Sequence, residues 1–348
     1  MAARILVLTS HPPFAEGGHL VVASALVDRL RAAGHDAEVM LTPQNRFGRQ
    51  GAAYLATWLT DVGLAHDGRP IDQVISFRFP SYAVRHPRHV CWLNHRMREY
   101  YDQWPRFSGP LSRRARLKER ARRAIIHTVD RYLLTRNVSR LFAQSLTVQA
   151  RLRRWGRISA EVLYPPPPPR AYRCDEYSDY VFVASRLTPL KRVDLIVDAL
   201  ARPEARGIRC IIAGDGPERA ALVGRIAQRN LDGRVTLVGG VGEGALVEYL
   251  ARCRAVCFPP LAEDYGLVTV EAFASRKPVI TCTDSGGPTE LVQHGTNGLV
   301  CAPEPLALAF AMRALMDDDA LAVRLGEAGH RQAAAISWER TLEKLIIV

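Results

Sequence analysis

Lysine is scarce in this chain of 348 residues, and the patterns that define several common protein classes are missing. With four lysines, the formal charge of +12 rests almost wholly on arginine. No apolar run approaches the ~20 residues that a membrane-spanning helix needs. The first residues, MAARILVLTS, enter a strand pattern directly and lack the architecture of a signal peptide. We therefore expect a cytoplasmic protein.

The usual signatures of metal sites and disulfides are missing as well. The chain has seven cysteines, and none of them forms a Cys-x-x-Cys pair; Cys253 and Cys257 come nearest. We interpret the cysteines as reduced and mostly buried thiols. The one Asp-x-Asp, in residues 317–319, lies between two helical patterns, and no Cys/His group has zinc spacing. The sequence predicts no metal ion and no cofactor.

Short apolar runs alternate with helical patterns along the whole chain. A helix is predicted over 19–33, between the first two strands. Such alternation indicates doubly wound parallel sheets, which are covered by helices on both faces. The predicted strands are 4–9, 37–41, 73–77, 89–93 and 139–143 in the first half, and 180–185, 209–213, 234–238, 254–258 and 279–282 in the second.

A run of five prolines, Pro165 to Pro169, separates the two halves. It fits neither a helix nor a central strand, and indicates a stiff polyproline II connector. We predict an α/β protein with two Rossmann-like domains facing a central cleft. The domains are 1–169 and 170–336, with a helix over 337–348 packing back on the first. Ligands bind such sheets beyond the carboxyl ends of the strands.

Two glutamates eight residues apart stand where a predicted strand passes into a helix. Glu263 falls in the loop, and Glu271 falls in the second turn of a helix that starts near Gly266. An ionised carboxylate can accept both hydroxyls of a vicinal diol. The first amides of a helix, here Gly266, Leu267 and Val268, can bind a phosphate. The alternative is an exposed loop glutamate and a helix glutamate favoured by the macrodipole.

This segment resembles the donor-binding signature of retaining GT-B glycosyltransferases of family four, the bacterial glycosyl transferases group 1. The resemblance extends over nearly the whole chain. It implies the GT-B fold and transfer of a hexose from a nucleotide-diphosphate sugar, with a UDP-sugar favoured over GDP-mannose. Glu271 would hold the ribose and Glu263 the hexose. The family pattern Glu-x-Phe/Tyr-Gly-Leu-x-x-x-Glu-Ala is matched by Glu263, Tyr265, Gly266, Leu267, Glu271 and Ala272.

The resemblance assigns further donor residues. Arg186 and Lys191, after the strand 180–185, would stabilise the departing diphosphate without a metal; two solvated surface cations are the alternative. The pair Gly17-Gly18 would approach the donor phosphate, and Gly214-Asp215 would lie beside the donor, although this last turn can be architectural. The family's Asn-Gly-x-Asp hinge signature is missing, which leaves the hinge geometry open.

A polar loop after the strand 89–93 is the candidate acceptor side. His95, Arg98, Tyr101 and Asp102 match a His-x-x-Arg-x-x-Tyr-Asp run that occurs in a subset of bacterial family-four enzymes. The resemblance places His95 near the donor sugar, where a neutral imidazole can donate a hydrogen bond. A loop histidine that is satisfied by the backbone is the alternative.

Basic residues concentrate in residues 85–157, which carry 19 Lys or Arg against four Asp or Glu, a local excess of +15. Such a field can attract an anionic membrane or a phosphorylated acceptor. No nucleic-acid module accompanies it, so we expect no nucleic acid partner. We expect a glycan or lipid-linked acceptor, with the protein peripheral at the inner leaflet if this region binds membrane. A solvated arginine-rich helix over 112–134 is the alternative.

Other functions share parts of this pattern. A nonhydrolysing sugar-nucleotide epimerase has the fold but would need catalytic carboxylates from elsewhere. A Rossmann oxidoreductase is disfavoured because no Gly-x-Gly-x-x-Gly follows the first strand. A noncatalytic sugar-nucleotide-binding protein, or a transferase acting on a soluble natural product, would look the same here. No Asp/Glu nucleophile pair is apparent, so the resemblance implies a front-face mechanism.

Overall fold

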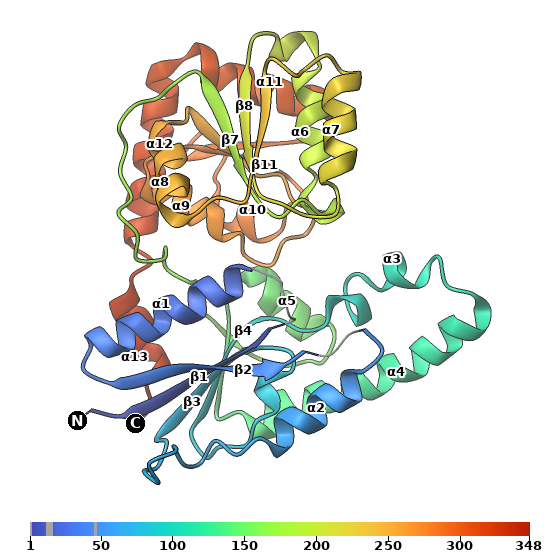
Figure 1. Cartoon of the computed structure of the whole chain (residues 1–348), viewed down its shortest axis with the longest axis vertical. Coiled ribbons are helices and arrows are strands. Elements are labelled where there is room, and N and C mark those ends of the chain that lie inside the picture. The colour runs from blue at the N-terminus through green and yellow to red at the C-terminus, as the bar shows by residue number, and fades with distance from the viewer. Residues whose placement is uncertain (1, 12–16, 45–46) are drawn as a thin grey trace. The chain divides into compact units, whose positions relative to one another are not determined.

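The computed structural model describes residues 2–11, 17–44 and 47–348 and divides the chain into two compact units (Figure 1). The N-terminal unit comprises Met1–Pro165 and Trp338–Val348, and the C-terminal unit comprises Pro166–Ser337. Each unit contains one six-stranded sheet with parallel strand pairings. The predicted fold class of doubly wound parallel sheets is confirmed.

The sheet of the N-terminal unit has the strand order β2-β1-β3-β4-β5-β6. The order reverses between β1 and β3, so the loops that follow these two strands meet at one edge. The central strands are buried on both faces, which explains their continuous apolar runs. The strands are β1 (Arg4–His11), β2 (Asp36–Pro43), β3 (Gln73–Arg78), β4 (His89–His95), β5 (Arg140–Ala143) and β6 (Glu161–Val162).

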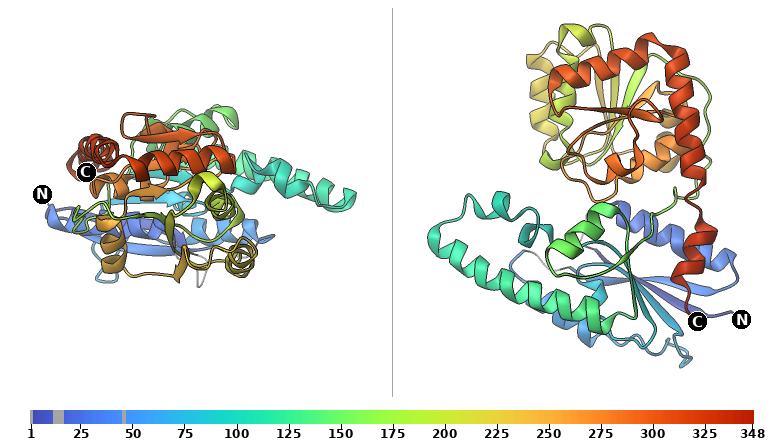
Figure 2. Two further views of the ribbon diagram at one scale, coloured as in Figure 1. Left: turned by 90° about the horizontal axis from the view of Figure 1, so that it is seen from above. Right: turned by 180° about the vertical axis from the view of Figure 1, so that it is seen from behind.

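Helices cover this sheet, and one of them extends beyond it. The helix α4 starts after Ser112, whose hydroxyl accepts a hydrogen bond from the Ala115 amide at 3.3 Å. With α3 it forms an arm that reaches away from the sheet of its unit (Figure 2). The helices are α1 (Gly18–Ala32), α2 (Gln50–Leu59), α3 (Trp104–Ser108), α4 (Arg113–Tyr132), α5 (Leu146–Arg154) and α13 (Trp338–Leu345).

The last helix, α13, packs on the N-terminal sheet although it is the end of the chain. The Gln73 side-chain amide donates to the Leu345 carbonyl at 2.6 Å, and its oxygen accepts from the Ile347 amide at 2.8 Å. The rings of Trp92 and Trp338 meet edge to face, with centroids 6.4 Å apart. These contacts join the chain end to β3 and β4.

The sheet of the C-terminal unit has the order β12-β11-β10-β7-β8-β9, which reverses between β10 and β7. The strands are β7 (Tyr180–Ala184), β8 (Arg209–Ala213), β9 (Val235–Gly239), β10 (Ala255–Cys257), β11 (Val279–Cys282) and β12 (Gly298–Cys301). The helices are α6 (Val193–Leu200), α7 (Arg219–Gln228), α8 (Glu243–Arg252), α9 (Leu267–Ala274), α10 (Gly287–Leu291), α11 (Pro305–Asp317) and α12 (Asp319–Ala334).

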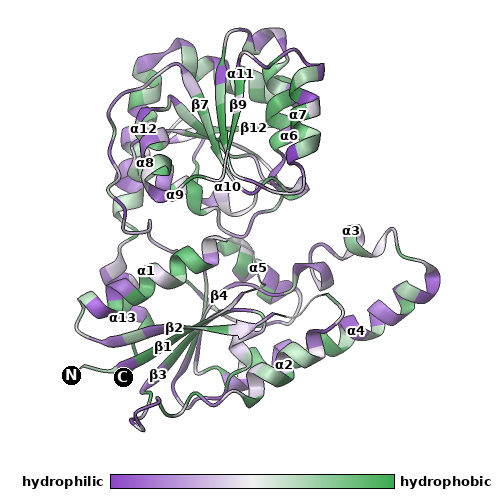
Figure 3. Ribbon diagram, in the orientation of Figure 1, coloured by the Kyte–Doolittle hydropathy of each residue, from purple (hydrophilic) through white to green (hydrophobic). Residues whose placement is uncertain are grey.

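Apolar side chains of the strands and of the helices above them form the core of the C-terminal unit. Hydrophobic colouring follows its strands in Figure 3. Val183 from β7, Ile196 from α6 and Met312 from α11 are almost fully buried in one cluster. On the other face α9 packs against α12, where Gly329 leaves room for the Phe273 ring.

All ten predicted strands are present, with ends that differ by two residues at most. Two strands, β6 and β12, were not predicted: β6 has two residues, and β12 is a short run that contains a glycine. All seven cysteines are free, and five of them are buried. Within the described ranges, no helix combines the length and apolar character needed to cross a membrane. The same residues contain no group of three or more His, Cys, Asp or Glu that could hold a metal ion.

Candidate functional site

The candidate donor site lies at the carboxyl ends of β7 and β10, the neighbouring strands between which the order of the C-terminal sheet reverses. The loop after β7 carries Arg186 and Lys191, and the loop after β10 carries Glu263. Lys191 Nζ lies 2.7 Å from Glu263 Oε2, and the two side chains are 16% and 19% exposed. The structure thus brings together residues that were predicted from two separate motifs.

Arg186 differs from Lys191 in having no partner. Its side chain is exposed and forms no hydrogen bond or ion pair with any residue that the structure describes. Lys191, by contrast, is paired with Glu263 and also stands 5.2 Å from the centroid of the Phe258 ring. The loop therefore carries one guanidinium without a partner among the described residues, that of Arg186. It also carries one ammonium, that of Lys191, whose charge is balanced by Glu263.

Arg192 holds the loops of the donor site together. It adopts a left-handed backbone conformation, with φ 50°, at the start of α6. Its Nε donates to the Pro259 carbonyl at 2.7 Å, and its terminal nitrogens reach the Asp284 carboxylate at 2.7 and 2.8 Å. The sequence analysis missed this role, because nothing in the spacing links Arg192 to residues 67 and 92 positions away.

The turn at Gly214 supports the loop that carries Arg186. A Cβ at Gly214 would lie 1.9 Å from the Ser185 carbonyl oxygen, so only glycine fits. The Leu187 amide donates to the Asp215 carbonyl at 2.8 Å, and the Asp215 carboxylate accepts from the Gly216 amide at 2.7 Å. These contacts fit the architectural interpretation of the Gly214-Asp215 turn.

The helix α9 begins at Leu267 with no side chain capping its first turn. Gly266 precedes it with φ 86° and ψ 69°, and a Cβ there would lie 2.9 Å from both Phe258 and Pro288. The first amides of a helix, at Leu267 and Val268, have no intrahelical acceptor. They and the helix dipole favour an anion such as a phosphate.

Glu271, from the second turn of α9, already has partners. Its side chain is buried, and Oε1 accepts from an Arg170 terminal nitrogen and, at 3.2 Å, from the Tyr172 hydroxyl. Arg170 also lies 2.8 Å from the carboxylate of Glu243. Burial raises the pKa of Glu271, and the positive charge of Arg170 opposes that shift.

The sequence analysis missed Arg170 and Tyr172. Both come just after the proline run, at the start of the C-terminal unit. An arginine and a tyrosine at such a position do not by themselves indicate a contact with Glu271. Their contacts with Glu271 span 101 and 99 residues, a separation that no local pattern predicts.

In the N-terminal unit, Gly17 and Gly18 stand at the start of α1, which also lacks a side-chain cap. Gly17 has an extended backbone, with φ −171°, and a Cβ there would lie 2.9 Å from His19 Nδ1. Residues 12–16, which precede this pair, lie outside the described part of the chain. The amides at the start of α1 suit an anion for the same reason as those of α9.

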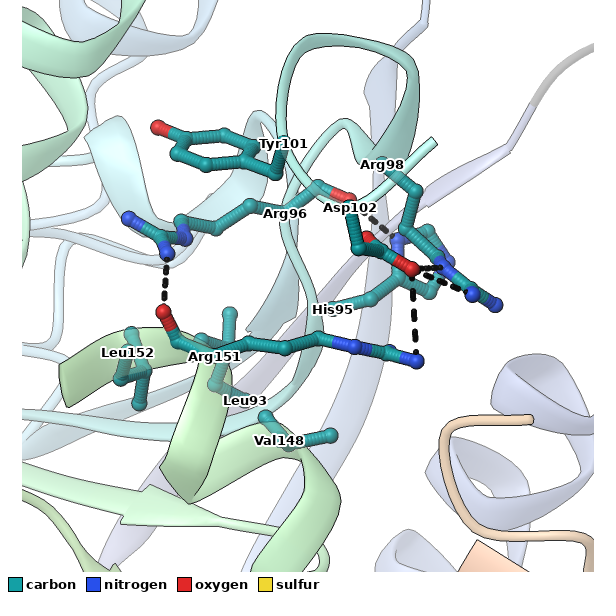
Figure 4. A pocket seen from close by; sticks show the side chains of 9 residues that line it. All are labelled: Leu93, His95, Arg96, Arg98, Tyr101, Asp102, Val148, Arg151 and Leu152. Carbon is teal, nitrogen blue, oxygen red and sulfur yellow. Dashed lines mark hydrogen bonds and ion pairs between the residues drawn. The ribbon is translucent and has the colours of Figure 1, made fainter. Parts of the chain in front are cut away.

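The predicted acceptor residues lie around a small cavity of about 20 Å³ (Figure 4), enough for one water molecule. Arg98 donates to Asp102 Oδ2 from Nε at 3.0 Å and from a terminal nitrogen at 2.6 Å, and Arg151 lies 3.4 Å from the same oxygen. The other oxygen, Oδ1, is buried and has no hydrogen-bond partner among the described residues. Asp102 therefore retains one acceptor for a water or a ligand hydroxyl.

His95 lies in this cluster with its tautomer fixed by the backbone. Its Nδ1 lies 2.7 Å from the Arg96 carbonyl, which can only accept, so Nδ1 carries the proton. In the neutral ring Nε2 is then an acceptor. The structure thus gives Nε2 the acceptor role, whereas the sequence analysis expected the neutral ring to donate.

Tyr101 contributes its ring to the cavity and its hydroxyl to the core. The hydroxyl donates to Asp130 Oδ2 at 2.6 Å, and the ring stacks on His127 with centroids 4.3 Å apart. Asp130 Oδ1 accepts from Tyr82 at 2.5 Å and also from Tyr54. Since the Tyr101 hydroxyl is held by this buried carboxylate, only the ring faces the cavity in this structure.

Residues 169–332 match the model of a protein family described as glycosyl transferases group 1. This match covers every strand of the C-terminal sheet and every loop of the candidate donor site. The match extends over almost the whole of the C-terminal unit. The predicted resemblance to group 1 glycosyl transferases is thereby confirmed for the unit that holds Arg186, Lys191, Glu263 and Glu271. The His95 loop lies outside the matched residues.

Curated relatives of this chain come from several bacteria. An exopolysaccharide phosphotransferase of Streptomyces coelicolor is 33% identical over 177 residues, which are 48% of this chain and 19% of that protein. A D-inositol 3-phosphate glycosyltransferase of Streptomyces avermitilis is 29% identical over 167 residues, 45% of this chain and 36% of that protein. The matches thus span well under half of the relatives' length.

Solved structures resemble the whole chain in fold. The sucrose-phosphate synthase of Thermosynechococcus elongatus superposes with a TM-score of 0.77 at 20% identity, over 99% of this chain and 97% of that one. The Anabaena protein HepE, in complex with UDP and glucose, superposes with a TM-score of 0.69 at 21% identity, over 98% and 97%. These likenesses establish the GT-B fold.

Proposed function

We propose that this protein is a retaining, metal-independent glycosyltransferase. It transfers a hexose from a nucleotide-diphosphate sugar to a hydroxyl of a glycan or a lipid-linked saccharide. A UDP-sugar is favoured over GDP-mannose as the donor. The Anabaena neighbour in complex with UDP and glucose supports that preference, since it shares the fold of both units.

The observation that carries the proposal is the composition of the donor site. An exposed guanidinium (Arg186), an ion pair (Lys191 and Glu263) and the uncapped start of α9 meet at the switch point of a single sheet. A nucleotide sugar has a diphosphate for the cations and amides, and hydroxyls for the carboxylates. In neither unit is the first strand followed by Gly-x-Gly-x-x-Gly, the fingerprint of a dinucleotide-binding site.

In the proposed reaction the bond between the anomeric carbon and the diphosphate oxygen breaks as the acceptor oxygen approaches the same face of the sugar. The departing phosphate oxygen takes the proton of the acceptor hydroxyl. Negative charge grows on the diphosphate during this step, and Arg186 and Lys191 stabilise it. Glu263, released from Lys191 when the phosphate arrives, would hold the hexose, and Glu271 the ribose. His95 Nε2 would accept from a sugar hydroxyl.

The proposal is tested by incubating the protein with UDP-glucose, UDP-N-acetylglucosamine or GDP-mannose and a prenyl-diphosphate-linked sugar. Nucleoside diphosphate release and the anomeric proton signal of the product are followed by NMR. We expect release with one UDP-sugar, an unchanged rate in excess EDTA, and retained anomeric configuration. Nucleotide binding without turnover on any acceptor would favour a noncatalytic binding protein. Turnover on a free sugar or a soluble aglycone alone would point to a soluble acceptor.

A further inference from the structure

An apolar groove of about 710 Å³ runs between α2 and α4 of the N-terminal unit, away from the residues assigned to the donor and the acceptor. Figure 1 shows the two helices side by side. Leu55 and Trp58 line the groove from α2, and Ile125 and Val129 line it from α4. The proposed reaction uses none of these side chains, so the groove needs a separate explanation.

Both helices expose large apolar side chains along this groove. Ile125 is 64% exposed and Tyr132 is 55% exposed on α4, and Leu55 is 58% exposed on α2. Leu117, 69% exposed, extends the same α4 stripe by two turns, because it lies eight residues before Ile125. Contiguous exposed apolar surface of this kind marks a binding site for an apolar ligand or partner.

Tyr54 and Ile126 present carbon at the floor of the groove. The hydroxyl of Tyr54 turns inward to the buried carboxylate of Asp130, so that only the tyrosine ring faces the groove. Ile126 beside it is 2% exposed. The carbon surface that Tyr54 and Ile126 present suits a hydrocarbon, which offers no hydrogen bonds.

Cations border the apolar surface. Lys118 and Arg122 line the groove from α4; Lys118 is exposed, and Arg122 forms an ion pair with Glu119. Arg85 lies over the Trp58 ring on the α2 side, 5.1 Å from its centroid. Within α4 there are eight Lys or Arg against Glu119 and the buried Asp130. A ligand that fills the groove therefore meets positive charge at its edge, and an anionic group is complementary to that charge.

We propose that this groove binds the hydrocarbon chain of a phosphate-bearing lipid, with the phosphate beside Lys118 and Arg122. The inference rests on the proposed function in one respect: a lipid-linked acceptor supplies a reason for the site. A second copy of this chain fits the groove less well, because a symmetric contact would bring two arginine-rich α4 helices together.

The test uses dodecyl phosphate below its micelle-forming concentration, and it follows the fluorescence of Trp58. Dodecyl maltoside has the same chain with a neutral headgroup, and inorganic phosphate is the headgroup alone. The Trp58→Phe variant identifies the signal of that residue. Leu55→Asp and Ile125→Asp put a charge into the groove at exposed positions, where the fold tolerates it. Phe310→Asp, at a side chain 55% exposed on α11 of the other unit, is the matched control.

We expect dodecyl phosphate to give a saturable blue shift that Trp58→Phe removes. Dodecyl maltoside should bind about tenfold more weakly, because it lacks the charge that Lys118 and Arg122 complement. Each groove variant should weaken binding of dodecyl phosphate about tenfold or more, since a carboxylate opposes burial of the chain. Phe310→Asp should bind like the wild type.

Equal affinity for the two amphiphiles, or no shift of Trp58 with either, would overturn the proposal. Dimerisation in analytical ultracentrifugation that Ile125→Asp abolishes would assign the groove to a second copy instead. UDP binding is measured by calorimetry on the same samples. If UDP binds and dodecyl phosphate does not, the lipid groove fails while the proposed transferase function stands.

Discussion

Arg170 and Glu271 form a buried ion pair inside the C-terminal unit, with side chains that are 8% and 7% exposed. The carboxylate that the sequence assigns to the ribose is therefore occupied on Oε1, by Arg170 and Tyr172. None of the described residues bonds to Oε2. A ribose hydroxyl would reach this second oxygen while Arg170 keeps the carboxylate oriented and ionised.

The first prediction concerns Glu271→Ala. We expect UDP affinity to fall about ten- to a hundredfold, which corresponds to the ~1.5–3 kcal/mol of a charge-assisted hydrogen bond. Isothermal titration of UDP measures it. Glu243→Ala is the matched control, because it removes the exposed partner of Arg170 and spares Glu271. Equal UDP affinities for Glu271→Ala and the wild type would remove Glu271 from the donor site.

The second prediction is a pH dependence of donor binding. Burial raises the pKa of Glu271, and only the ionised form accepts a ribose hydroxyl, so affinity should rise as the pH increases through that pKa. Arg170 lowers this pKa, so Arg170→Gln should move the acidic limb of the affinity profile to higher pH. UDP-glucose is the appropriate ligand, since its diphosphate diester does not titrate in this range. If the acidic limb of the affinity profile lay at the same pH in the wild type and in Arg170→Gln, the effect of Arg170 on the pKa of Glu271 would be contradicted.

The third prediction separates chemistry from binding at Arg186. Because negative charge on the leaving diphosphate is greatest in the transition state, Arg186→Ala should lower kcat about a hundredfold and change donor KM much less. Steady-state kinetics with saturating acceptor measure both. Arg219→Ala, at another exposed arginine of the same unit, serves as the control. A wild-type kcat with only a raised KM would limit Arg186 to ground-state binding.

The fourth prediction concerns the stability of the N-terminal unit. His89 at the start of β4 is fully buried, with Nε2 2.7 Å from Ser76 Oγ, and burial lowers its pKa from 6.5 to about 4. The unfolded chain then binds a proton that the folded chain excludes. The contribution of His89 to the free energy of unfolding is fully present above pH 6.5. It declines by ~3 kcal/mol as the pH falls to 4.

His89→Gln removes this titration. Its melting temperature should fall less steeply than that of the wild type between pH 6.5 and 4, whatever its stability at neutral pH. Carboxylates that titrate in the same range affect both proteins alike and cancel in the comparison. If the melting temperatures of the two proteins fell in parallel as the pH decreased over this range, His89 would be protonated in the folded state.

The fifth prediction concerns the basic helix α4. Replacing Arg113, Arg114 and Arg120, which are all exposed, with glutamine should weaken binding to anionic vesicles on the order of a hundredfold at low salt. Arg123 is left intact, because its Nε donates to the Tyr100 carbonyl at 2.7 Å and it packs over Trp104.

Two measurements accompany the vesicle experiment. Three exposed arginines of the C-terminal unit, Arg206, Arg219 and Arg331, give the matched control when they are changed to glutamine. Wild-type binding should also fall steeply with added salt. A wild-type protein that ignores anionic vesicles at low salt would leave α4 as a solvated helix.

Local sequence patterns were sufficient for the fold and for part of the site. Continuous apolar runs located ten strands, because a strand buried on both faces needs them. The family resemblance assigned Lys191 and Glu263 to one donor site, and the structure brings them together because β7 and β10 are neighbouring strands.

Contacts set by tertiary packing could not be predicted in the same way. Three tyrosines converge on Asp130 from separate segments, and the Tyr101 hydroxyl is thereby withdrawn from the loop where the sequence placed it. The Arg170–Glu271 pair likewise depends on the path of the chain after the proline run. Neither contact leaves a periodic or spaced signal in the sequence.

Hydrogen exchange on UDP binding is the most direct test that the donor binds at the switch point of the C-terminal sheet. Amides of residues 185–192 and 263–271 should exchange more slowly with UDP present, with Leu267 and Val268 protected because they bind the phosphate. Amides of α7 should be unchanged. Protection confined to α7, or to the N-terminal unit alone, would contradict a donor site built from Arg186, Lys191 and Glu263.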